Sequence, residues 1–474
     1  MANEISADIC VIGGGSGGLL VAAGASQMGA EVVLFEPGKM GGDCLNYGCV
    51  PSKSMIAAAR AAQAIRSADK FGIGAAEPVV DFQKVHDHVH GVIGAIAPHD
   101  SVERFEGLGV RVIQAKGKFV GPTSIQAGDT VVNAKRVVIS TGSHSCAPPI
   151  PGLGTVPYLT NETVFDRTEA PEHLLVIGGG PIASELSQAH RRLGCEVTIL
   201  ETAKTLSKDD PELAEVVCTR MLKEGVTIRQ EIKILSIEKD GDGVTVNFRD
   251  GGKEESVTGS DLLVAAGRVP NLEGLDLEAA GIDYDKSGIK VDGRLRTTNK
   301  KVFAIGDAAG SFQFTHVAGY HAGIVIRNIL FRMPAKVDYS ALSWVTYTDP
   351  ELAHVGMTEV QAREKYGDVR VLRHPFAEND RALAERQADG LAKIITTKKG
   401  VIVGASIVGP HAGELIQSWI LPIQKKMKIG AIAGLIIPYP TLGEVNKRAA
   451  GSYYTPKIFS ERMRAIVRFL LKFA

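Results

Sequence analysis

The sequence has no long apolar run, no basic N-terminal start and no excess of either charge. No stretch of about 18 or more apolar residues occurs, so we predict no transmembrane helix. The first ten residues, MANEISADIC, lack the basic start and apolar core of a secretory signal, and we therefore expect a cytoplasmic protein. Basic and acidic residues both total 53, so the net charge is zero and nothing predicts binding to nucleic acid.

Cysteine is too scarce for a secreted disulfide scaffold, because only six occur in 474 residues. They are Cys10, Cys44, Cys49, Cys146, Cys195 and Cys218. In a reducing compartment, a close pair such as Cys44 and Cys49 is typical of catalysis or metal binding rather than of structure. The length predicts about two to four domains, since single hydrophobic cores stop growing near ~250–300 residues.

Glycine is abundant, with 53 residues, and its first cluster lies between two apolar runs. The run from Ile9 to Ile12 reads as a buried strand, and a small-residue helical stretch and a second strand, Val32 to Phe35, follow. Between the strands stand Gly13, Gly15 and Gly18. This G-x-G-x-x-G context predicts a dinucleotide site, with phosphates at the helix N-terminus and Glu36 accepting hydrogen bonds from a ribose.

The same unit recurs later in the chain. Strand residues 174–177 precede Gly178, Gly180 and Ala183, and strand residues 197–200 end at Glu201. Glu36 follows Gly13 by 23 residues, and Glu201 follows Gly178 by 23 residues. Two copies with matching context favour two dinucleotide sites over glycine-rich turns that bind nothing.

The remaining strands predict the fold class. Further strand-then-glycine edges occur at 137–142, 262–268 and 302–307, and residues 391–409 read as a hairpin. We therefore predict an α/β protein with two Rossmann-like dinucleotide-binding domains and a C-terminal α+β domain. The expected boundaries are 1–150 for the first part of the first domain, 151–270 for the second domain, 271–339 for the second part of the first domain and 340–474 for the C-terminal domain.

The segment from Gly41 to Lys53 carries the chemistry. Cys44 and Cys49 are separated by four residues at the apparent start of a helix. A helix N-terminus and the positive charge of Lys53 both lower a thiol pKa, and the thiolate is the reactive form. The alternatives are two structural cysteines or half of a zinc site. Zinc requires a second ligand pair, which the sequence lacks, so we predict no metal.

In combination, four motifs resemble those of the class I pyridine nucleotide–disulfide oxidoreductases, in the branch of dihydrolipoamide dehydrogenase and mercuric reductase. The first is GG-x-C-x4-C-x-PSK at 41–53. The others are the Ser-Thr-Gly strand end at 140–142, the GR-x-PN sequence at 267–271 and the T-x5-FAIGD-type sequence that ends at Asp307. The resemblance covers almost the whole chain and implies FAD, NAD(P) and a homodimer.

The resemblance also implies roles for individual residues. The FAD site would comprise Gly13, Gly15, Gly18, Glu36, Gly42, Thr141, Gly142, Asp307 and His316. The NAD site would comprise Gly178, Gly180, Ala183, Glu201, Gly267 and Arg268. Cys49 would contact the flavin, Cys44 would exchange with substrate, and Lys53 would pair with Glu185 beside the flavin. Glu201 would bond the 2′-hydroxyl of NAD and repel a 2′-phosphate, so we expect NADH rather than NADPH, although Lys204 lies close by.

One position departs from the family pattern. Disulfide reductases of this family carry His-Pro-Thr-x-x-Glu near the C-terminus, whereas here Tyr439 replaces the histidine and Glu444 keeps the acid. A tyrosine titrates near ~10 and is a poor base at neutral pH. Mercuric reductases resemble the chain in having tyrosine at this place, but they also carry a C-terminal cysteine pair, and here no cysteine follows Cys218.

Three functions therefore remain open. The first is an NADH-linked oxidoreductase of a small-molecule or lipoyl-type disulfide. The second is a reductase of a metal ion or another soft electrophile. The third is a redox sensor or complex subunit without turnover, which retention of the cysteines, Lys53 and Glu185 argues against. The resemblance implies that Tyr439 and Glu444 complete the partner subunit's active site.

Two weaker patterns lie outside these motifs. His86, His88 and His90 read as an exposed helix face rather than a metal site. The C-terminal segment has an apolar stripe with basic residues between its members. The apolar residues are Phe459, Met463, Ile466, Val467 and Leu470, and the basic ones are Arg462, Arg464, Arg468 and Lys472. We favour packing of this segment against the dimer partner over contact with an anionic membrane.

Overall fold

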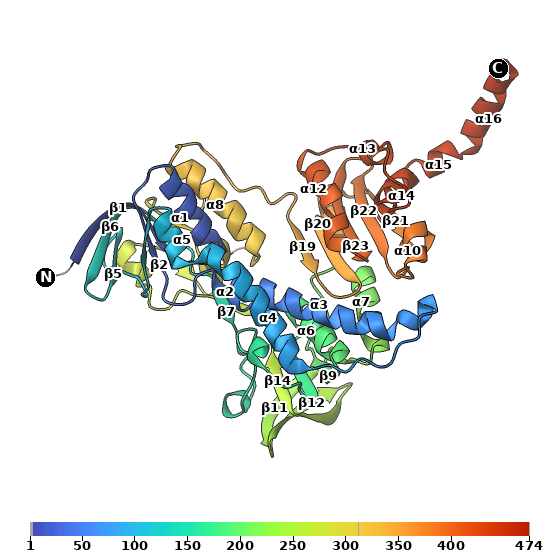
Figure 1. The fold of residues 1–474 in the computed structure, drawn as a ribbon. Coiled ribbons are helices and arrows are strands. Elements are labelled where there is room, and N and C mark those ends of the chain that lie inside the picture. The colour runs from blue at the N-terminus through green and yellow to red at the C-terminus, as the bar shows by residue number, and fades with distance from the viewer. Residues whose placement is uncertain (1–2, 311, 474) are drawn as a thin grey trace.

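The computed structural model describes residues 3–310 and 312–473. Within this range the chain forms three sheet-centred units and a projecting C-terminal extension (Figure 1). The predicted α/β class is confirmed, with α-helices packed on one face of the first sheet and a C-terminal sheet of antiparallel strands. None of the helices in these two ranges is both long enough and apolar enough to span a bilayer.

The first unit is a seven-stranded sheet in the order β3-β2-β1-β6-β5-β4, with β18 paired to β6. Its strands are β1 (Asn3–Ile12), β2 (Val32–Phe35), β3 (Val110–Ile113), β4 (Lys118–Phe119), β5 (Ser124–Ala127), β6 (Thr130–Ile139) and β18 (Val302–Ala304). β1 is parallel to both β2 and β6, and β18 is parallel to β6. The chain thus returns to the first sheet after forming the second unit.

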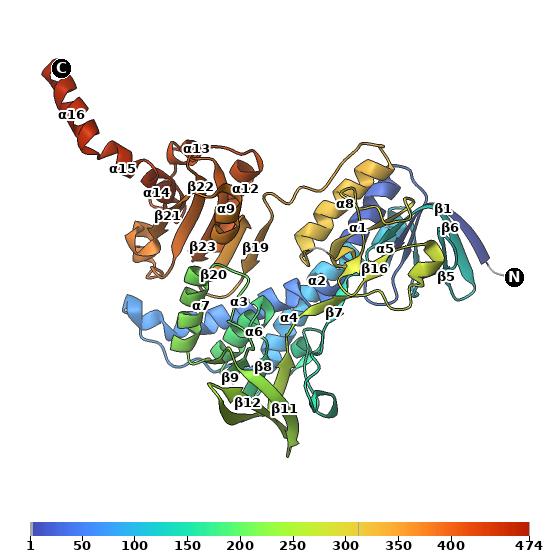
Figure 2. The same cartoon turned by 180° about the vertical axis from the view of Figure 1, so that it is seen from behind.

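Burial on both faces explains why β1 reads as a continuous apolar run. Cys10 and Ile12 face one core, and Ile9 and Val11 face the other. On the second face, α1 (Ser16–Gln27) lies beside α8 (Thr315–Ile329), as both views show (Figures 1 and 2). The two helices that begin at the predicted flavin site therefore share one layer.

The second unit repeats the arrangement on a smaller scale. Its parallel sheet has the order β10-β9-β8-β14, and a three-stranded antiparallel sheet, β11-β12-β13, lies beside it. The elements are β8 (His173–Ile177), α6 (Pro181–Arg192), β9 (Glu196–Leu200), α7 (Pro211–Lys223), β10 (Thr227–Arg229), β11 (Lys233–Asp240), β12 (Gly243–Asp250), β13 (Lys253–Gly259) and β14 (Asp261–Val264). Both glycine-turn units are therefore strand–helix–strand units, as the sequence predicts.

The third unit is an antiparallel sheet in the order β19-β20-β23-β22-β21. Its strands are β19 (Ser343–Thr346), β20 (Glu351–Gly356), β21 (Val369–Pro375), β22 (Leu391–Thr397) and β23 (Ile402–Gly409). β22 and β23 form the predicted hairpin. Helices α12 (Gln417–Gln424) and α14 (Glu444–Ser452) pack around the fully buried Trp419, and α9 (Glu359–Tyr366) packs separately against β21, β22 and β23.

Buried ion pairs join the third unit to the second. The Lys393 side chain on β22 is 6% exposed, and its ammonium lies 2.7 Å from Asp210 and 2.9 Å from Glu359. Arg192 at the end of α6 is also buried and pairs with Glu224 at 2.6 Å and Asp349 at 2.9 Å. Because an unpaired charge would be costly at either place, these networks fix how the two units meet.

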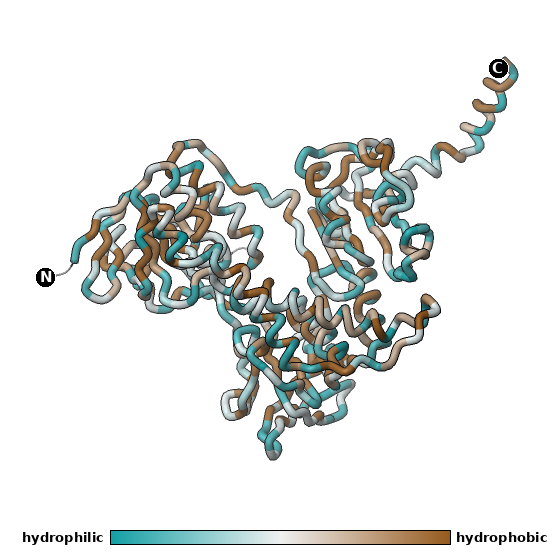
Figure 3. Tube along the Cα trace, in the orientation of Figure 1, coloured by the Kyte–Doolittle hydropathy of each residue, from teal (hydrophilic) through white to brown (hydrophobic). Residues whose placement is uncertain are grey.

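The last helices leave the body of the protein. α15 (Thr455–Ile458) and α16 (Glu461–Leu470) extend away from the third unit and end at the extreme of the molecule (Figures 1 and 2). Apolar residues, drawn brown in Figure 3, concentrate in the three sheets, whereas apolar and polar residues alternate along this extension. None of its apolar side chains belongs to a hydrophobic core of the described residues.

Candidate active site

The two close cysteines lie on different helices. Cys44 belongs to α2 (Gly42–Asn46), and Cys49 is the first residue of α3 (Cys49–Arg66). The prediction of a single helix start for both thiols is therefore wrong. Gly48 causes the break: its backbone is non-helical, and a Cβ there would lie 2.8 Å from the Asp43 carboxylate. A side chain at position 48 would therefore press on Asp43 at the turn that brings the second thiol back toward the first.

Both cysteines are free thiols in the structure, and they lie within hydrogen-bonding reach of each other. The Cys49 sulfur is 3.5 Å from the hydroxyl of Thr315, the first residue of α8. Two helix N-termini, those of α3 and α8, therefore meet at Cys49. Their free N–H groups favour negative charge on its sulfur.

The thiol environment separates the two cysteines. The hydrogen bond from Cys44 lowers the pKa of Cys49 most, and Thr315 and Lys53 lower it further, to about 6. The same hydrogen bond and burial raise the pKa of Cys44 above its ordinary value. This environment thus favours the thiolate at Cys49 and the protonated thiol at Cys44.

Lys53 and Glu185 form the ion pair that the resemblance implies. Lys53 lies one turn along α3 from Cys49, and its Nζ is 2.7 Å from Oε2 of Glu185 on α6. The Glu185 side chain is 6% exposed, and its other oxygen accepts the backbone N–H of Tyr347 at 2.8 Å. The Tyr347 ring lies under the ammonium, 4.5 Å from Nζ to the centroid. Both carboxylate oxygens are therefore satisfied.

The first glycine turn forms a close-fitting cradle. Gly13 has a φ of +109°, and a Cβ there would lie 2.4 Å from the Ser140 carbonyl oxygen. A Cβ on Gly42 would lie 2.7 Å from the Cα of Gly15. The cysteine loop and the glycine turn thus approach at a distance that only glycines permit.

Two features of this cradle fit a dinucleotide. Gly15 precedes α1 without a side-chain cap, so the first N–H groups of the helix are free for a pyrophosphate. Gly18, inside α1, sits against the Gly13 carbonyl. Glu36 accepts hydrogen bonds from the N–H groups of Gly14 at 2.6 Å and Gly38 at 2.7 Å, which hold its carboxylate at the strand end. These residues would hold the adenosine diphosphate part of FAD.

Asp307 lies at the opposite end of the cradle, just after β18. Its Oδ2 accepts a hydrogen bond from Ser143 at 2.5 Å, and burial raises its pKa. Thr141 and Gly142 form the adjacent turn, where the Thr141 hydroxyl donates to the Asn271 carbonyl at 2.7 Å. This carboxylate is placed to accept hydrogen bonds from a polyol chain.

The structure reveals an unexpected position for Arg268. Its guanidinium donates to the Ser143 hydroxyl at 2.9 Å and lies 3.2 Å from Asp43 in the cysteine loop. Gly267, just before it, accepts the N–H of Cys146 at 3.0 Å. Arg268 therefore connects Ser143, which binds Asp307, with Asp43 in the cysteine loop. No sequence motif predicts this contact.

His316 is the second residue of α8, as the sequence predicts. Its Nε2 lies 2.8 Å from the Ser343 carbonyl oxygen, and burial lowers its pKa. The imidazole is thus directed at the strand that opens the third unit. The uncapped N–H groups of α8 remain beside Cys49 and Thr315.

The second glycine turn repeats the first. Gly178 has a φ of +111°, and a Cβ there would lie 2.5 Å from the Ala265 carbonyl oxygen. Gly180 precedes α6 without a side-chain cap, and Ala183 is fully buried in the helix. Glu201 accepts the N–H groups of Gly179 and Ala203, so its carboxylate is fixed like that of Glu36. This turn fits a second dinucleotide.

Tyr439 and Glu444 lie on the third unit. Tyr439 is 68% exposed, and its hydroxyl donates to Asp380 at 2.9 Å, a contact that raises the pKa of Tyr439. Glu444 begins α14 and lies 3.9 Å from Arg448. Their predicted role in a partner subunit's site stays a prediction.

The predicted histidine face lies apart from these residues. His86 and His90 are one turn apart on α4 (Phe82–Ile96), with ring centroids 4.1 Å apart. Across residues 3–310 and 312–473, no cluster of three or more potential ligands could hold a metal.

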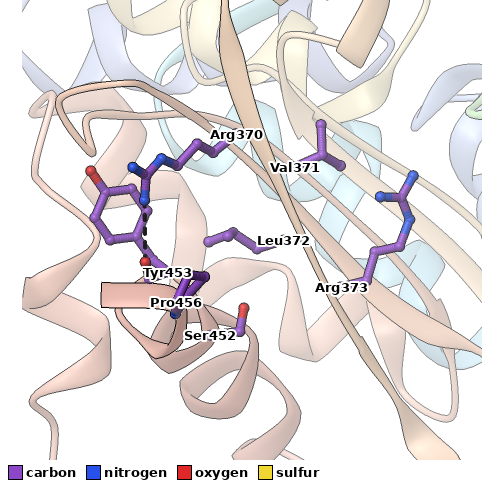
Figure 4. Close-up of a pocket in the computed structure, with 7 residues that line it drawn as sticks. All are labelled: Arg370, Val371, Leu372, Arg373, Ser452, Tyr453 and Pro456. Atoms are coloured by element: carbon purple, nitrogen blue, oxygen red, sulfur yellow. Dashed lines mark hydrogen bonds between the residues drawn. The ribbon is translucent and has the colours of Figure 1, made fainter. Parts of the chain in front are cut away.

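A pocket of about 390 Å³ lies between β21 and the end of α14 (Figure 4). Its lining consists of Arg370, Val371, Leu372, Arg373, Ser452, Tyr453 and Pro456. Arg370 stacks on the Tyr453 ring, and Arg373 forms a two-pronged pair with Glu212. No predicted site residue lines it, and both of its cations are already engaged.

Four residues contact the site, but the sequence alone does not predict these contacts. They are Asp43, Ser143, Thr315 and Tyr347. Tyr347 and Ser143 act through a backbone N–H and a hydroxyl whose partners lie more than 160 residues away. The only available signal was their position beside the motifs, such as Asp43 next to Cys44.

Residues 7–322 match the family model described as "Pyridine nucleotide-disulphide oxidoreductase", and residues 342–450 match the dimerisation domain of the same group. The chain is 35% identical over 460 residues to a dihydrolipoyl dehydrogenase of Geobacillus stearothermophilus, covering 94% of this chain and 96% of that protein. It is 32% identical over 446 residues to a mercuric reductase of Staphylococcus aureus, covering 94% and 82%.

Solved structures give the same picture. The HOCl-induced flavoprotein disulfide reductase RclA of Escherichia coli, in its Cu(II) complex, superimposes with a TM-score of 0.84 at 26% identity, over 93% of this chain and 98% of that one. LpdA of Mycobacterium tuberculosis superimposes with a TM-score of 0.85 at 26% identity, over 94% and 99%.

Proposed function

Because this chain belongs to the pyridine nucleotide–disulphide oxidoreductase family, we propose that it is an NADH-linked enzyme whose Cys44–Cys49 pair exchanges electrons with a small-molecule or lipoyl-type disulfide. The observation that carries the proposal is the contact between a Cys44 thiol and a Cys49 sulfur whose pKa is lowered. A pair that only stabilised the fold would need neither the Lys53–Glu185 ion pair nor two helix N-termini at one sulfur.

FAD, when bound, supplies two-electron exchange with the nicotinamide on one side and with the cysteine pair on the other. Gly13, Gly15, Glu36 and Asp307 would hold it, and Lys53 would lie beside its ring system. The second glycine turn, with Glu201, would hold NADH in preference to NADPH. The chain's own chemistry is then confined to the two sulfurs and their protons.

In the reducing direction, Cys44 must lose its proton before it can attack a disulfide. The Cys49 thiolate is the base within reach, because it already accepts the hydrogen bond of Cys44. The Cys44 sulfur then forms a mixed disulfide and expels one substrate thiolate. Cys49, after returning its proton to that leaving group, attacks Cys44, closes the Cys44–Cys49 disulfide and releases the second substrate thiolate.

A second candidate follows from Tyr439. Its pKa is raised by Asp380, so even less phenolate forms at neutral pH than for an unperturbed tyrosine, and Tyr439 cannot replace an imidazole as a base there. A soft electrophile, such as a thiol-binding metal ion, needs no base at this position because it binds thiolates directly. We keep reduction of such an electrophile as the alternative.

Anaerobic NADH oxidation with lipoamide as sole acceptor distinguishes these functions, after NADH has been seen to bleach the flavin. Turnover that requires both cysteines supports the proposed reduction of a disulfide substrate. Cys44→Ser and Cys49→Ser should each abolish this turnover. Bleaching without turnover would contradict the first proposal and favour the soft electrophile. No bleaching at all would contradict both.

We propose a homodimer, supported by the match of residues 342–450 to the family's dimerisation domain. Tyr439 and Glu444 would then face the cysteine pair of the partner subunit. Sedimentation equilibrium of the purified protein tests the dimer, and a monomeric mass at micromolar concentration would contradict it.

A further inference from the structure

The C-terminal helix is unpartnered within the described chain. Residues 455–473 lie beyond the dimerisation-domain match, which ends at 450. Every side chain of α16 is exposed except the partly buried Met463, and the helix points away from the third unit (Figures 1 and 2). The family's own dimerisation domain therefore accounts for none of this extension.

The helix is divided into two faces. At about 100° per residue, one arc of about 120° holds only apolar side chains. On α16 and the turn that follows it, these are Met463, Ile466, Val467, Leu470 and Phe473, whereas Phe459 lies before the extended cap residue Ser460 and off this helix. Leu470 is 59% exposed and Phe473 is 76% exposed. An apolar face left in water is unfavourable, so the helix requires a binding partner for it.

The opposite arc is basic. Arg464, Arg468 and Lys472 lie on it, and Arg462 lies at its border with the apolar face. Residues 455–473 hold five basic residues and one acid, Glu461, which already pairs with Arg464 at 2.9 Å. The whole chain has a net charge of zero, so this extension is a local concentration of positive charge.

The apolar and basic faces together indicate what kind of surface binds this helix. A second protein copy would have to supply an apolar groove bordered by acids along the full helix. An anionic bilayer meets both faces at once, since it takes apolar side chains among its acyl chains and basic ones at its headgroups. We propose that residues 455–473 lie in the interface of an anionic lipid bilayer and hold the enzyme at a membrane surface. This replaces the packing against the dimer partner favoured from the sequence.

Vesicle co-sedimentation of the full-length, flavin-loaded protein tests the proposal. Vesicles of phosphatidylcholine with about one third phosphatidylglycerol should pellet the protein, and vesicles of phosphatidylcholine alone should pellet far less. A chain ending at Tyr454 should remain in solution with both. Since no residue of α15 or α16 belongs to a hydrophobic core of the described chain, this truncation should keep the melting temperature of the parent.

Two neighbouring substitutions provide a matched pair. Leu470→Ser, at the centre of the apolar face, should lower the vesicle partition coefficient about tenfold. Ala465→Ser, on the basic face, should change it less than about twofold. Both substitutions leave the net charge unchanged. A difference between their partition coefficients therefore reports on the face of the helix that each residue occupies.

Two results would overturn the proposal. Equal pelleting of the full-length and truncated chains would show that the extension does not bind lipid. A shift from dimer to monomer on truncation, measured by sedimentation equilibrium without vesicles, would show instead that a second copy covers the helix.

Discussion

The Tyr347 ring lies 4.5 Å below the Lys53 ammonium, and the Tyr347 backbone N–H donates to the carboxylate that Lys53 binds. Tyr347, the residue that follows β19, therefore contacts both members of the Lys53–Glu185 ion pair beside the cysteines. Lys53 is also one of the charges that lower the pKa of Cys49. The position of the third unit is thus connected to thiol chemistry in the first.

This relationship predicts that Tyr347→Leu loosens Lys53 and raises the pKa of Cys49, whereas Tyr347→Phe keeps the ring and changes little. The lost cation–π contact is expected to cost about 0.5–1 kcal/mol, because Lys53 is partly exposed. Ultraviolet thiolate absorbance of the reduced protein as a function of pH measures the shift. Identical titrations of the Leu and Phe variants would contradict this role of the ring.

The cysteine pair predicts a specific pH dependence of alkylation. Because the folded pKa of Cys49 is lowered from 9.0 to about 6, its thiolate forms as pH rises through about 6, well below the range of an ordinary thiol. The rate of Cys49 alkylation by iodoacetamide should therefore rise near that pH and then stay level. Cys44, whose pKa is raised, should react more slowly than Cys49 at neutral pH, and its labelling should increase toward alkaline pH.

The Cys44→Ser variant serves as the control for this profile. A serine hydroxyl is a weaker stabiliser of the thiolate in place of the shared proton, and the Cys49 profile should shift toward higher pH. Mass spectrometry of the alkylated peptide assigns each label to its cysteine. Faster labelling of Cys44 than of Cys49 at neutral pH would contradict the assignment.

Burial predicts how strongly the Lys53–Glu185 pair affects stability. Lys53→Met leaves a buried carboxylate without its charge partner and should lower the free energy of unfolding by about 3 kcal/mol. Lys135 pairs with Asp8 at a similar distance, 2.6 Å, but is 79% exposed. Lys135→Met should therefore lower the free energy of unfolding much less than Lys53→Met does. Urea unfolding of both variants compares them, and equal losses would refute the difference in burial.

Tyr439 predicts a gain of function. Tyr439→His would place an imidazole that titrates near ~6.5 where the family's disulfide reductases carry one, and it should raise lipoamide turnover at neutral pH about tenfold or more. Tyr439→Phe is the control, because it removes the hydroxyl and its contact with Asp380. If Tyr439→Phe alone abolishes turnover, the tyrosine hydroxyl takes part in the reaction and the argument fails.

Glu201 predicts the nicotinamide preference. The parent should have a higher kcat/KM with NADH than with NADPH, since a fixed carboxylate repels a 2′-phosphate. Glu201→Gln removes the negative charge, keeps an acceptor for one of the two N–H groups of Gly179 and Ala203, and should narrow the ratio of kcat/KM for NADH to that for NADPH by about tenfold. Steady-state kinetics with both nucleotides measure it. A parent that uses NADPH as well as NADH would show that Glu201 does not discriminate.

Local patterns predicted the strand, glycine turn and helix of both dinucleotide units, because these depend on residues close together in the sequence. The strand predicted at 32–35 is β2, and the hairpin predicted at 391–409 is β22 with β23. The Lys53–Glu185 pair was predicted only through the family resemblance. No periodicity relates two residues that are 132 positions apart.

Contacts that depend on the tertiary fold could not be predicted. The helix break at Gly48 depends on the approach of Asp43, and the Tyr347 contact depends on where the third unit docks. The position of Arg268 beside Asp43 depends on two units meeting. The Tyr347 and Arg268 contacts join segments that are distant in sequence, whereas Asp43 and Gly48 are only five residues apart.

The addition of β18 to β6 also constrains synthesis on the ribosome. β6 ends at Ile139, whereas its neighbour β18 begins at Val302, followed by Asp307 and α8. At bacterial or eukaryotic translation speeds, the intervening residues take roughly 10–30 s to emerge. During this interval the nascent chain has the glycine turn and both cysteines but lacks the strand and carboxylate that complete the flavin cradle. Flavin loading must therefore wait for the second unit, and reactive thiols are made well before the cofactor site that controls them.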